Sequence, residues 1–305
     1  MQIAVIGEIF KDVIYPFQSP YHTGLGGILY NLLTLAQFAP PESKLYPVSH
    51  LSLEDKETVE ALVLPYPSIN LKGLLISRNY RTSKAILRYD ISGTRTEEIL
   101  IPNPSIGIKS IKPFLKCNGI LINFTARRDI QLETLRLIRK RSPALIMADL
   151  HNLASRIDRK DNRYYSPLPS RSRWLKHLDI IQGNESEYCH LFNEETKNLN
   201  GQQNTLMKAL TEGPQIAIMA LGEKGVCMAW AHNNQTFFHH WKGIPVSHPI
   251  DPTGCGDVFA ASFFWHYLTH QNPSEAAKFA NQAAAINSTL HTLKDLPALR
   301  ILLNK

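Results

Sequence analysis

The sequence predicts an α/β protein with a mostly parallel central sheet, helices on both faces of that sheet, and a small additional β structure. Three observations lead to this prediction. Apolar runs of strand length alternate with helical patterns through most of the 305 residues. Hydrophobic residues make up 44% of the chain, which is enough for a large core. Two runs near residues 84–101 break the alternation and have the form of a β hairpin.

The expected elements follow from the apolar patterns. The strands expected are Ile3–Gly7, Leu71–Ile76, Gly119–Phe124, Leu145–Asp149, Leu178–Gln182 and Ile216–Leu221. The helices expected are Gly27–Gln37, Leu53–Leu64, Gln131–Arg141, Gln202–Thr211, Asp257–His270 and Pro273–Leu290. Strands separated by helices pair in parallel, and the crossover helices then cover both faces of the sheet.

The expected hairpin consists of Lys84–Tyr89 and Arg95–Ile101, with a turn around Asp90-Ile-Ser-Gly93. Two placements remain open for it. It forms a small cover over a site, or it lies at the edge of the main sheet and extends it.

Composition excludes several classes of protein. The net charge is +7, from 33 Lys and Arg against 26 Asp and Glu, but the basic residues are mostly scattered and no aromatic residues alternate with them. A nucleic-acid partner is therefore not expected. No apolar run approaches a membrane span, the amino terminus lacks the basic start of a signal peptide, and the four cysteines form no metal-ligand spacing. A cytoplasmic protein with reduced thiols is expected.

The stretch Asp251-Pro-Thr-Gly-Cys-Gly-Asp257 carries the main functional signal, because it leads into the apolar helix Val258–Leu268. The start of a helix leaves backbone N–H groups unpaired, and Gly254 and Gly256 let an anion approach them closely. Asp257 adds a base beside that anion. This combination suits phosphoryl transfer to an alcohol. The plain alternative is a helix cap, but a cap needs neither two glycines nor a second aspartate.

This stretch resembles the signature of the ribokinase-like (PfkB) carbohydrate kinases. The chain lacks the Walker A phosphate loop and the glycine fingerprint of dinucleotide-binding folds, which removes the commonest competing nucleotide folds. The resemblance implies a three-layer α/β/α ribokinase-like fold formed by residues 1–305 as a single domain. It also implies a small β lid, with segments near residues 10–25 and 82–102. By the resemblance, Asp257 is the catalytic base, and the backbone of Gly254, Cys255 and Gly256 holds the transferred phosphoryl group.

A second motif, Gly26-Gly27-Ile-Leu-Tyr-Asn31, matches the family's amino-terminal pattern of two glycines followed by an asparagine. In the family these residues contact the sugar, so Gly26, Gly27 and Asn31 are expected to bind the acceptor. Asp12, shortly after the first strand, has the place and role of a family aspartate that accepts hydrogen bonds from sugar hydroxyls. Ligands of open parallel sheets bind beyond the carboxyl ends of the strands, which agrees with this placement.

Other residues are expected on the nucleotide side. Asn184 and Glu187 match the family's motif that orders Mg²⁺ and its waters, with Glu187 acting through water; the same pair can also form a helix capping box. Gly222 and Gly225 match a turn that borders ATP, although Ala220 stands where the family usually has threonine. Thr253 in the signature and Asn281 in the last long helix complete the expected nucleotide contacts.

The expected activity is ATP-dependent phosphorylation of a hydroxyl on a small sugar or sugar-like molecule, with Mg²⁺ as cofactor. Two alternatives remain open: a nucleoside kinase of the same family, with Phe10, Tyr15, Phe17 and Tyr30 lining a slot for the base, or a catalytically inactive sensor of sugar or nucleotide. The expected partners are small molecules, without nucleic acid or membrane, and the chain is expected to be a monomer or a homodimer. The basic segment 152–174 is either a solvated loop or a face of the site that favours a phosphorylated substrate.

Overall fold

A nine-stranded sheet forms the centre of the computed structural model, which describes residues 1–15, 21–91, 95–125, 127–151, 153–168, 170–246, 249–290 and 293–303. The strand order is β15-β14-β13-β12-β9-β8-β1-β4-β5. In chain order these strands are β1 (Gln2–Ile6), β4 (Lys44–Ser52), β5 (Leu74–Ser77), β8 (Gly119–Asn123), β9 (Leu145–Asp149), β12 (Ile180–Asn184), β13 (Ile216–Ala220), β14 (Gly225–His232) and β15 (Gln235–Lys242).

The sheet is parallel from β13 to β5, and β14 and β15 close one edge as an antiparallel hairpin. All six expected strands belong to this sheet, as predicted. The expected run Leu71–Ile76 is strand only from Leu74, because Leu71–Gly73 forms a 3₁₀ turn. Sequence reasoning did not identify β4, β14 or β15.

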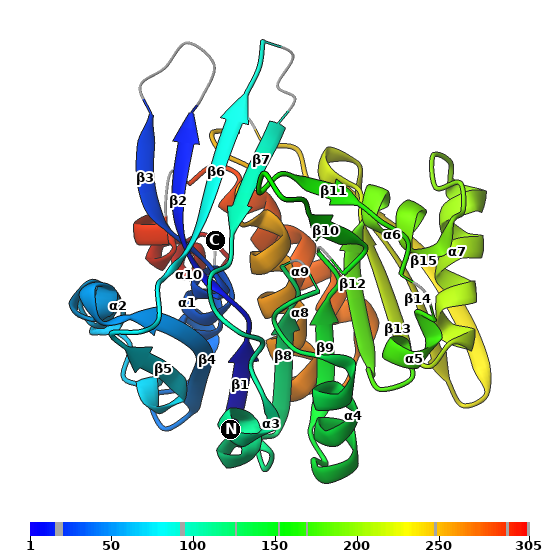
Figure 1. Cartoon of the computed structure of the whole chain (residues 1–305). Coiled ribbons are helices and arrows are strands. Elements are labelled where there is room, and N and C mark those ends of the chain that lie inside the picture. Colours follow the sequence, from blue (N-terminus) through cyan, green and yellow to red (C-terminus); the bar gives the residue numbers. More distant parts are fainter. Residues whose placement is uncertain are drawn as a thin grey trace.

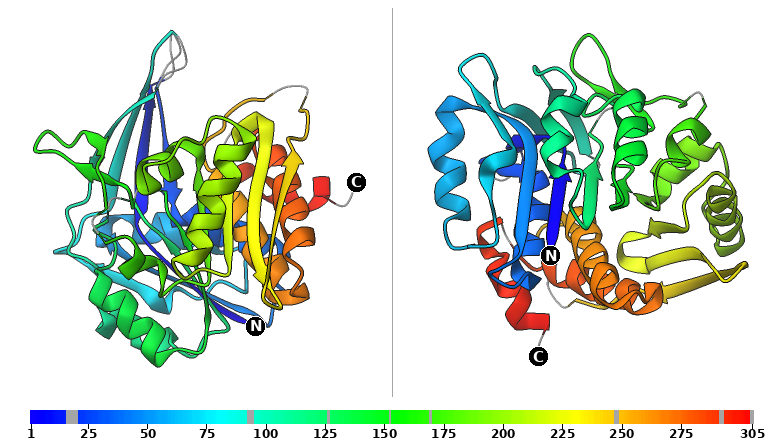
Figure 2. Two further views of the ribbon diagram at one scale, coloured as in Figure 1. Left: turned by 90° about the vertical axis from the view of Figure 1, so that its right-hand side faces the viewer. Right: turned by 90° about the horizontal axis from the view of Figure 1, so that it is seen from below.

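Helices cover both faces of the main sheet, and Figure 2 shows the two layers. One face carries α1 (Ile28–Phe38), α2 (Lys56–Val63), α8 (Cys255–His270), α9 (Pro273–Asn287) and α10 (Pro297–Leu303). The other carries α3 (Ile108–Ile111), α4 (Leu132–Arg141), α5 (Ser172–Leu175), α6 (Glu185–Phe192) and α7 (Leu199–Thr211). Further 3₁₀ turns are Leu53–Asp55, Lys112–Phe114, Gly222–Lys224 and Leu293–Asp295. The predicted three-layer α/β/α architecture is therefore confirmed.

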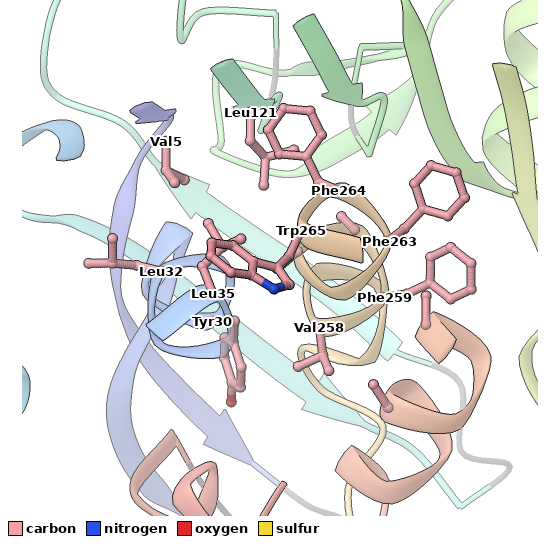
Figure 3. Close-up of a cluster of buried hydrophobic side chains, with 14 of the residues drawn as sticks. Val5, Tyr30, Leu32, Leu35, Leu121, Val258, Phe259, Phe263, Phe264 and Trp265 are labelled. Atoms are coloured by element: carbon pink, nitrogen blue, oxygen red, sulfur yellow. The ribbon is translucent and has the colours of Figure 1, made fainter. Parts of the chain in front are cut away.

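The core of the first face joins α1 and α8 to the sheet (Figure 3). Phe264 of α8 lies against Leu121 of β8, and Trp265 lies against the α1 side chains. Gly119 permits this close approach, because a Cβ there would lie 2.7 Å from the Phe264 ring. Burial of large apolar side chains stabilises such a contact by about 1.5–3 kcal/mol each. The packing fixes the start of α8 over the carboxyl ends of the strands.

A separate four-stranded sheet, here called the small sheet, has the order β3-β2-β6-β7. Its strands are β2 (Ile9–Tyr15), β3 (His22–Gly27), β6 (Ser83–Tyr89) and β7 (Arg95–Leu100). The expected hairpin is thus present, and it belongs to the small sheet instead of extending the main one. Figure 1 shows this sheet standing beyond the carboxyl ends of the main strands. Residues 16–20 and 92–94, which include parts of the expected lid segments, lie outside the described residues.

The basic segment 152–174 is not a plain loop. It contains a hairpin of β10 (Ser155–Ile157) and β11 (Arg163–Tyr165), followed by α5. Residues 152 and 169 lie outside the described residues. In the described parts of the chain, none of the helices is both long and apolar enough to span a bilayer.

Candidate active site

The loop Asp251–Gly254 brings the start of α8 against α1. Gly254 adopts φ +77°, and a Cβ at this position would lie 2.4 Å from the ring of Tyr30. Both observations require glycine here, since L side chains avoid this backbone region and the ring leaves no room. Asp251 accepts a hydrogen bond from the Thr253 N–H at 2.8 Å, which holds the turn. The loop is therefore shaped by Gly254 and anchored on Tyr30.

Gly256 has a different environment. A Cβ built there would meet nothing nearer than Nε2 of Gln182, at 3.9 Å. Protein packing does not require glycine at this position, which leaves bare backbone facing open space at the first turn of α8. The N–H of Cys255 donates to the Pro252 carbonyl at 3.2 Å, and that of Val258 donates to Gly254 at 2.8 Å. The Cys255 N–H, which was expected to hold the phosphoryl group, is therefore engaged within the loop. The helix-start N–H groups suited to an anion are those of Gly256 and Asp257.

Asp257 is held by two asparagines. Nδ2 of Asn123, at the carboxyl end of β8, donates to its Oδ1 at 2.5 Å, and Nδ2 of Asn31 donates to its backbone carbonyl at 2.9 Å. Burial raises the pKa of Asp257 to about 6, while the His151 charge and the Asn123 hydrogen bond act in the opposite direction. A carboxylate with this pKa is ionised at neutral pH and suited to accept a proton.

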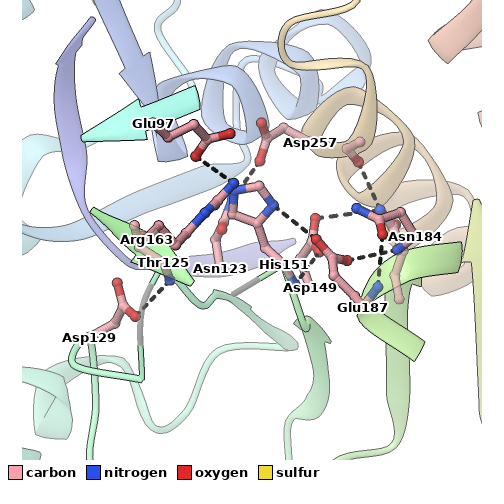
Figure 4. Close-up of polar contacts among 12 residues, drawn as sticks. Glu97, Asn123, Thr125, Asp129, Asp149, His151, Arg163, Asn184, Glu187 and Asp257 are labelled. Carbon is pink, nitrogen blue, oxygen red and sulfur yellow. Dashed lines mark hydrogen bonds and ion pairs between the residues drawn. The ribbon is translucent and has the colours of Figure 1, made fainter. Parts of the chain in front are cut away.

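Figure 4 shows further polar residues around Asp257 at the ends of neighbouring strands. Asp149 ends β9, and Gln182 lies in β12. Nε2 of Gln182 donates to the Gly256 carbonyl at 2.9 Å and to Asp149 at 3.4 Å. Burial, together with the charges of Glu187 and Asp257, raises the pKa of Asp149 to about 8, although the His151 charge acts in the opposite direction. Sequence reasoning missed Asn123, Asp149 and Gln182, although each ends an expected strand or lies next to its end.

Asn184 and Glu187 form the expected capping box of α6. The Glu187 N–H donates to Asn184 at 2.9 Å, and the Asn184 N–H donates to the Glu187 carboxylate at 2.7 Å. The other carboxylate oxygen of Glu187 lies 3.5 Å from Nδ1 of His151. Among the described residues no group of His, Cys, Asp and Glu side chains is arranged to enclose a metal ion. Asn184 and Glu187 therefore suit Mg²⁺ only when the ion is already bound to phosphates and contacts these side chains through water.

On the acceptor side, Asp12 of β2 lies over Gly26 of β3. A Cβ at Gly26 would lie 2.0 Å from the Asp12 carboxylate, so the missing side chain makes room for that group. Gly27 adopts φ +65°, and a Cβ there would lie 2.2 Å from the Glu8 carbonyl. Asn31 is fully buried, and its Oδ1 accepts a hydrogen bond from Asn123 at 3.0 Å. The structure thus gives Asn31 a positioning role toward Asp257 besides its expected contact with the acceptor.

The residues expected on the nucleotide side occupy three elements. The Thr253 hydroxyl is buried and has no hydrogen-bond partner among the described residues, which agrees with its expected contact with a ligand. Gly222 adopts φ +59° with open space where a Cβ would lie, whereas a Cβ at Gly225 would meet the Trp241 carbonyl at 2.1 Å. Asn281 on α9 donates to the Lys242 carbonyl at 2.9 Å and so joins α9 to β15.

The aromatic slot of the nucleoside alternative is not supported by its named residues. Tyr30 is 9% exposed and packs on Gly254, and Phe10 is 6% exposed within the apolar cluster of the small sheet. Tyr15 stacks on Tyr21 with the Arg88 guanidinium over its ring. Phe17 lies outside the described residues. Two of the four rings are therefore committed to packing.

Comparison with known proteins identifies the family. The sequence profile described as pfkB family carbohydrate kinase matches residues 123–297, which is more than half of the chain. The chain belongs to this family. As a pfkB carbohydrate kinase it is an enzyme of the sugar-kinase class, in agreement with the resemblance seen in the sequence. Among curated proteins, no sequence matches the chain.

Solved structures of ribokinases share the fold. A ribokinase from Arabidopsis thaliana, complexed with ribose and ATP, is similar over 99% of this chain and 98% of its own, with a TM-score of 0.78 at 17% identity. A Thermotoga maritima ribokinase is similar over 99% and 97%, with a TM-score of 0.74 at 21% identity. A pyrophosphate-dependent kinase of the ribokinase family, in a sulfate complex, is similar over 94% and 95%, with a TM-score of 0.76 at 16% identity. The predicted ribokinase-like fold is confirmed.

Proposed function

We propose that this pfkB family member transfers the γ-phosphoryl group of ATP to a hydroxyl of a small sugar or sugar-like acceptor, with Asp257 as the base. The observation that carries the proposal is the pairing of Asp257 with the bare backbone of Gly256. Asp257 supplies the proton acceptor, and Gly256, the residue before it, supplies an unobstructed N–H group at the start of a helix.

In the reaction, the acceptor O–H gives its proton to the Asp257 carboxylate as its oxygen forms a bond to the γ-phosphorus. The bond from that phosphorus to the bridging oxygen breaks, and ADP leaves. The N–H groups of Gly256 and Asp257 stabilise the negative charge in transit. Asn123 and Asn31 hold Asp257 in place through the hydrogen bonds described above.

The acceptor lies between Asp12 and Asp257 in this proposal. The ring of Tyr30 supports that placement: burial raises the pKa of its hydroxyl far above the usual range, and the charges of Asp12, Asp251 and Asp257 raise it further. The carboxylates expected to bind and to deprotonate the acceptor thus both act on the hydroxyl of the same buried ring. Asp12 orients hydroxyls, and the bare Gly26 keeps its carboxylate in position.

The donor lies along the start of α8, with Thr253, Gly222, Gly225 and Asn281 around the nucleotide. The free Thr253 hydroxyl and the open space at Gly222 support this arrangement. Glu187 would hold Mg²⁺ through water when the ion is bound with the nucleotide, and the ion would then supply positive charge to the phosphates. ATP is the proposed donor. Because one of the similar structures is that of a pyrophosphate-dependent kinase, the test also measures transfer from pyrophosphate.

The test measures phosphoryl transfer by the whole chain from ATP or pyrophosphate to a panel of pentoses, hexoses, inositols and nucleosides. Asp257→Asn keeps the shape and removes the base. We expect kcat to fall by about 10²–10⁴-fold with ATP binding retained. Glu57→Gln, at an exposed position in the first turn of α2, serves as the charge-removing control and should retain activity. Near-normal turnover by the Asp257→Asn variant would refute the assigned base, and transfer only to nucleosides would favour the alternative acceptor.

A further inference from the structure

The β10–β11 hairpin attaches to the free edge of the small sheet. The Ile99 N–H of β7 donates to the Asp161 carbonyl at 2.8 Å, and Glu98 and Asn162 form an antiparallel bridge. Ile157 packs into the apolar cluster of the small sheet. The hairpin forms a sheet of its own, and the turn before β11 joins it to the free edge of the small sheet, although it belongs to the segment that follows β9.

The register of the small sheet places Glu97 of β7 on the same face as Asp12. Asp12 pairs with Ala85 and Ala85 with Ile99, so these three side chains form one row across the sheet. Leu87 and Glu97 form the next row on the same face, since side chains two residues apart on a strand point the same way. The acceptor-facing side therefore carries a second carboxylate, at a position that the family motifs do not mark.

Arg163 of β11 forms an ion pair with Glu97. The side chains are only 16% and 8% exposed, respectively, so both charges are largely removed from solvent. The pair joins the hairpin to the small sheet, and the negative charge of Glu97 balances the positive charge of Arg163. A buried pair of this kind depends on both partners, because either charge alone is costly to bury.

A cavity of about 420 Å³ opens between β7 and the hairpin, and Glu97 and Arg163 form part of its wall. This volume is within the range of about 300–1,000 Å³ typical of small-molecule sites. Thr96, Ser155 and Tyr165 add hydroxyl groups to the lining. The lining combines hydrogen-bonding groups with the apolar ring surfaces of Tyr164 and Tyr165.

The Glu97–Arg163 pair lies near the polar residues around Asp257, on the side of His151. Figure 4 shows Arg163 reaching toward His151, with Asp257 and Asn123 beyond it. The electrostatic influence of Arg163 on His151, and of His151 on Asp257, agrees with this view. The pair therefore lies on the Asp12 face of the small sheet and on the His151 side of Asp257.

We propose that Glu97 and Arg163 form a selectivity element that binds the distal hydroxyls of an uncharged polyol and disfavours acceptors that already carry a phosphate or carboxylate. The proposal rests on the kinase function proposed above and specifies the acceptor class of the same site. The carboxylate accepts hydrogen bonds from hydroxyl groups, and the guanidinium donates them. A phosphate or carboxylate that approaches Arg163 also approaches the negative charge of Glu97, which repels it.

The other basic residues of the segment 152–174 do not supply a phosphate site in the described structure. Arg171 pairs with Glu212 at 2.6 Å and covers the ring of Phe192. Four more lie exposed on the outside of the chain: Arg156, Arg159, Lys160 and Arg173. The segment's positive charge is thus mostly solvated or paired, and the expectation of a phosphorylated substrate loses its main support.

Ligand binding tests the proposal without requiring turnover. The whole chain carrying Asp257→Asn is titrated by calorimetry with neutral sugars and inositols, with their monophosphates, and with the corresponding sugar acids. We expect neutral polyols to bind more tightly than their phosphates. Adding Glu97→Gln should weaken polyol binding by about 10- to 100-fold, the effect of losing a hydrogen bond to a charged group. It should also reduce the preference over phosphates, because Arg163 is left unbalanced.

The matched control is Glu98→Gln, the neighbouring residue on the opposite face, which is 39% exposed and pairs with Arg88. It should leave both affinities unchanged. Arg163→Met should weaken phosphate binding relative to the parent chain, so it should increase the preference for neutral polyols, whereas Glu97→Gln should reduce it. Thermal unfolding checks that each variant is folded. Tighter binding of a phosphorylated acceptor by the parent chain, no binding of any neutral polyol, or equal effects of the two glutamate variants would overturn the proposal. Kinase function is judged separately, by turnover of the unmodified chain.

Discussion

Asn123 and Asp257 join the end of a central strand to the start of the helix that carries the catalytic signature. Nδ2 of Asn123 is 2.5 Å from Oδ1 of Asp257 and also donates to Asn31 at 3.0 Å. One amide thus sets the direction of the carboxylate relative to both the sheet and α1. The hydrogen bond favours the ionised form of Asp257 and so partly offsets the effect of its burial.

The first prediction concerns the pH dependence of the reaction. The pKa of Asp257 is raised to about 6, and a base acts only when it has lost its proton. We expect kcat/KM to be low at pH 5, to rise through a midpoint near pH 6, and to level off above pH 7. Initial rates across this pH range, with ATP saturating and the acceptor well below its KM, measure kcat/KM for the acceptor. A midpoint near pH 4 would mean that Asp257 is not buried as described.

Replacing Asn123 should move that profile. Asn123→Leu keeps the volume approximately and removes the hydrogen bond that lowers the pKa of Asp257. The midpoint should therefore shift to higher pH, and kcat should fall by about 10²-fold because the carboxylate is no longer oriented. The KM for the donor should change little. An unshifted midpoint with reduced kcat would assign Asn123 to packing alone.

The buried charge of Asp257 should also cost stability. Because the folded-state pKa lies above the ordinary value of 3.8, the folded chain holds this proton more tightly than the unfolded chain does. The contribution of Asp257 to stability therefore falls as pH rises from about 4 to 6 and stays low above that. Asp257→Asn should be more stable than the parent by about 1–3 kcal/mol at pH 8 and nearly equal at pH 4. Urea unfolding at the two pH values measures the difference.

The hydrophobic patterns predicted the parallel part of the fold, but not all of its strands. β4 is a central strand, yet it contains Pro47 opposite Val5, with Ser49 and His50 shortly after it. Proline and polar residues argue against a central strand, and only the burial created by β1 and β5 overrides that local signal. The antiparallel pair β14–β15 was missed for a related reason, because β15 is largely exposed and lacks a continuous apolar run.

The candidate site was predictable where the chemistry is contiguous in sequence. The segment around Asp257 and the glycine pair before Asn31 both mark their positions by unusual local composition. Asn123, Asp149 and Glu97 carry no such mark. Strand order and register bring Asn123 and Asp149 to the carboxyl ends of neighbouring strands and place Glu97 on the Asp12 face of the small sheet, and no local pattern encodes that order. The position of Glu97 in particular depends on the pairing of β6 with both β2 and β7.

Two glycines of the signature should respond differently to the same substitution. Gly254→Ala places a methyl group 2.4 Å from the Tyr30 ring at φ +77°, so it should lower stability by about 2–4 kcal/mol. Gly256→Ala meets no protein atom closer than 3.9 Å and lies in the first turn of a helix. It should therefore be slightly more stable than the parent.

The activity of Gly256→Ala should fall although its stability rises. In Gly256→Ala the methyl group lies in the space proposed for the transferred phosphoryl, so kcat/KM should fall by about 10²-fold despite the gain in stability. Thermal unfolding and initial rates on the same preparations measure both effects. Full activity of Gly256→Ala would place the phosphoryl group elsewhere.

The last prediction tests Asp12 through its neighbour on β3. Gly26→Ala brings a methyl group to 2.0 Å from the Asp12 carboxylate, which must turn away, whereas Gly24→Ala meets nothing within 4 Å. Both glycines lie on the same strand, and Gly24 pairs directly with Asp12, which makes it the matched control. If Asp12 binds hydroxyls of the acceptor, Gly26→Ala should raise the KM for the acceptor by about 10-fold or more. The KM for ATP should stay unchanged, and Gly24→Ala should resemble the parent in both constants. An equal rise in both KM values for Gly26→Ala would indicate a general distortion of the small sheet, and Asp12 would then have no separate role in binding.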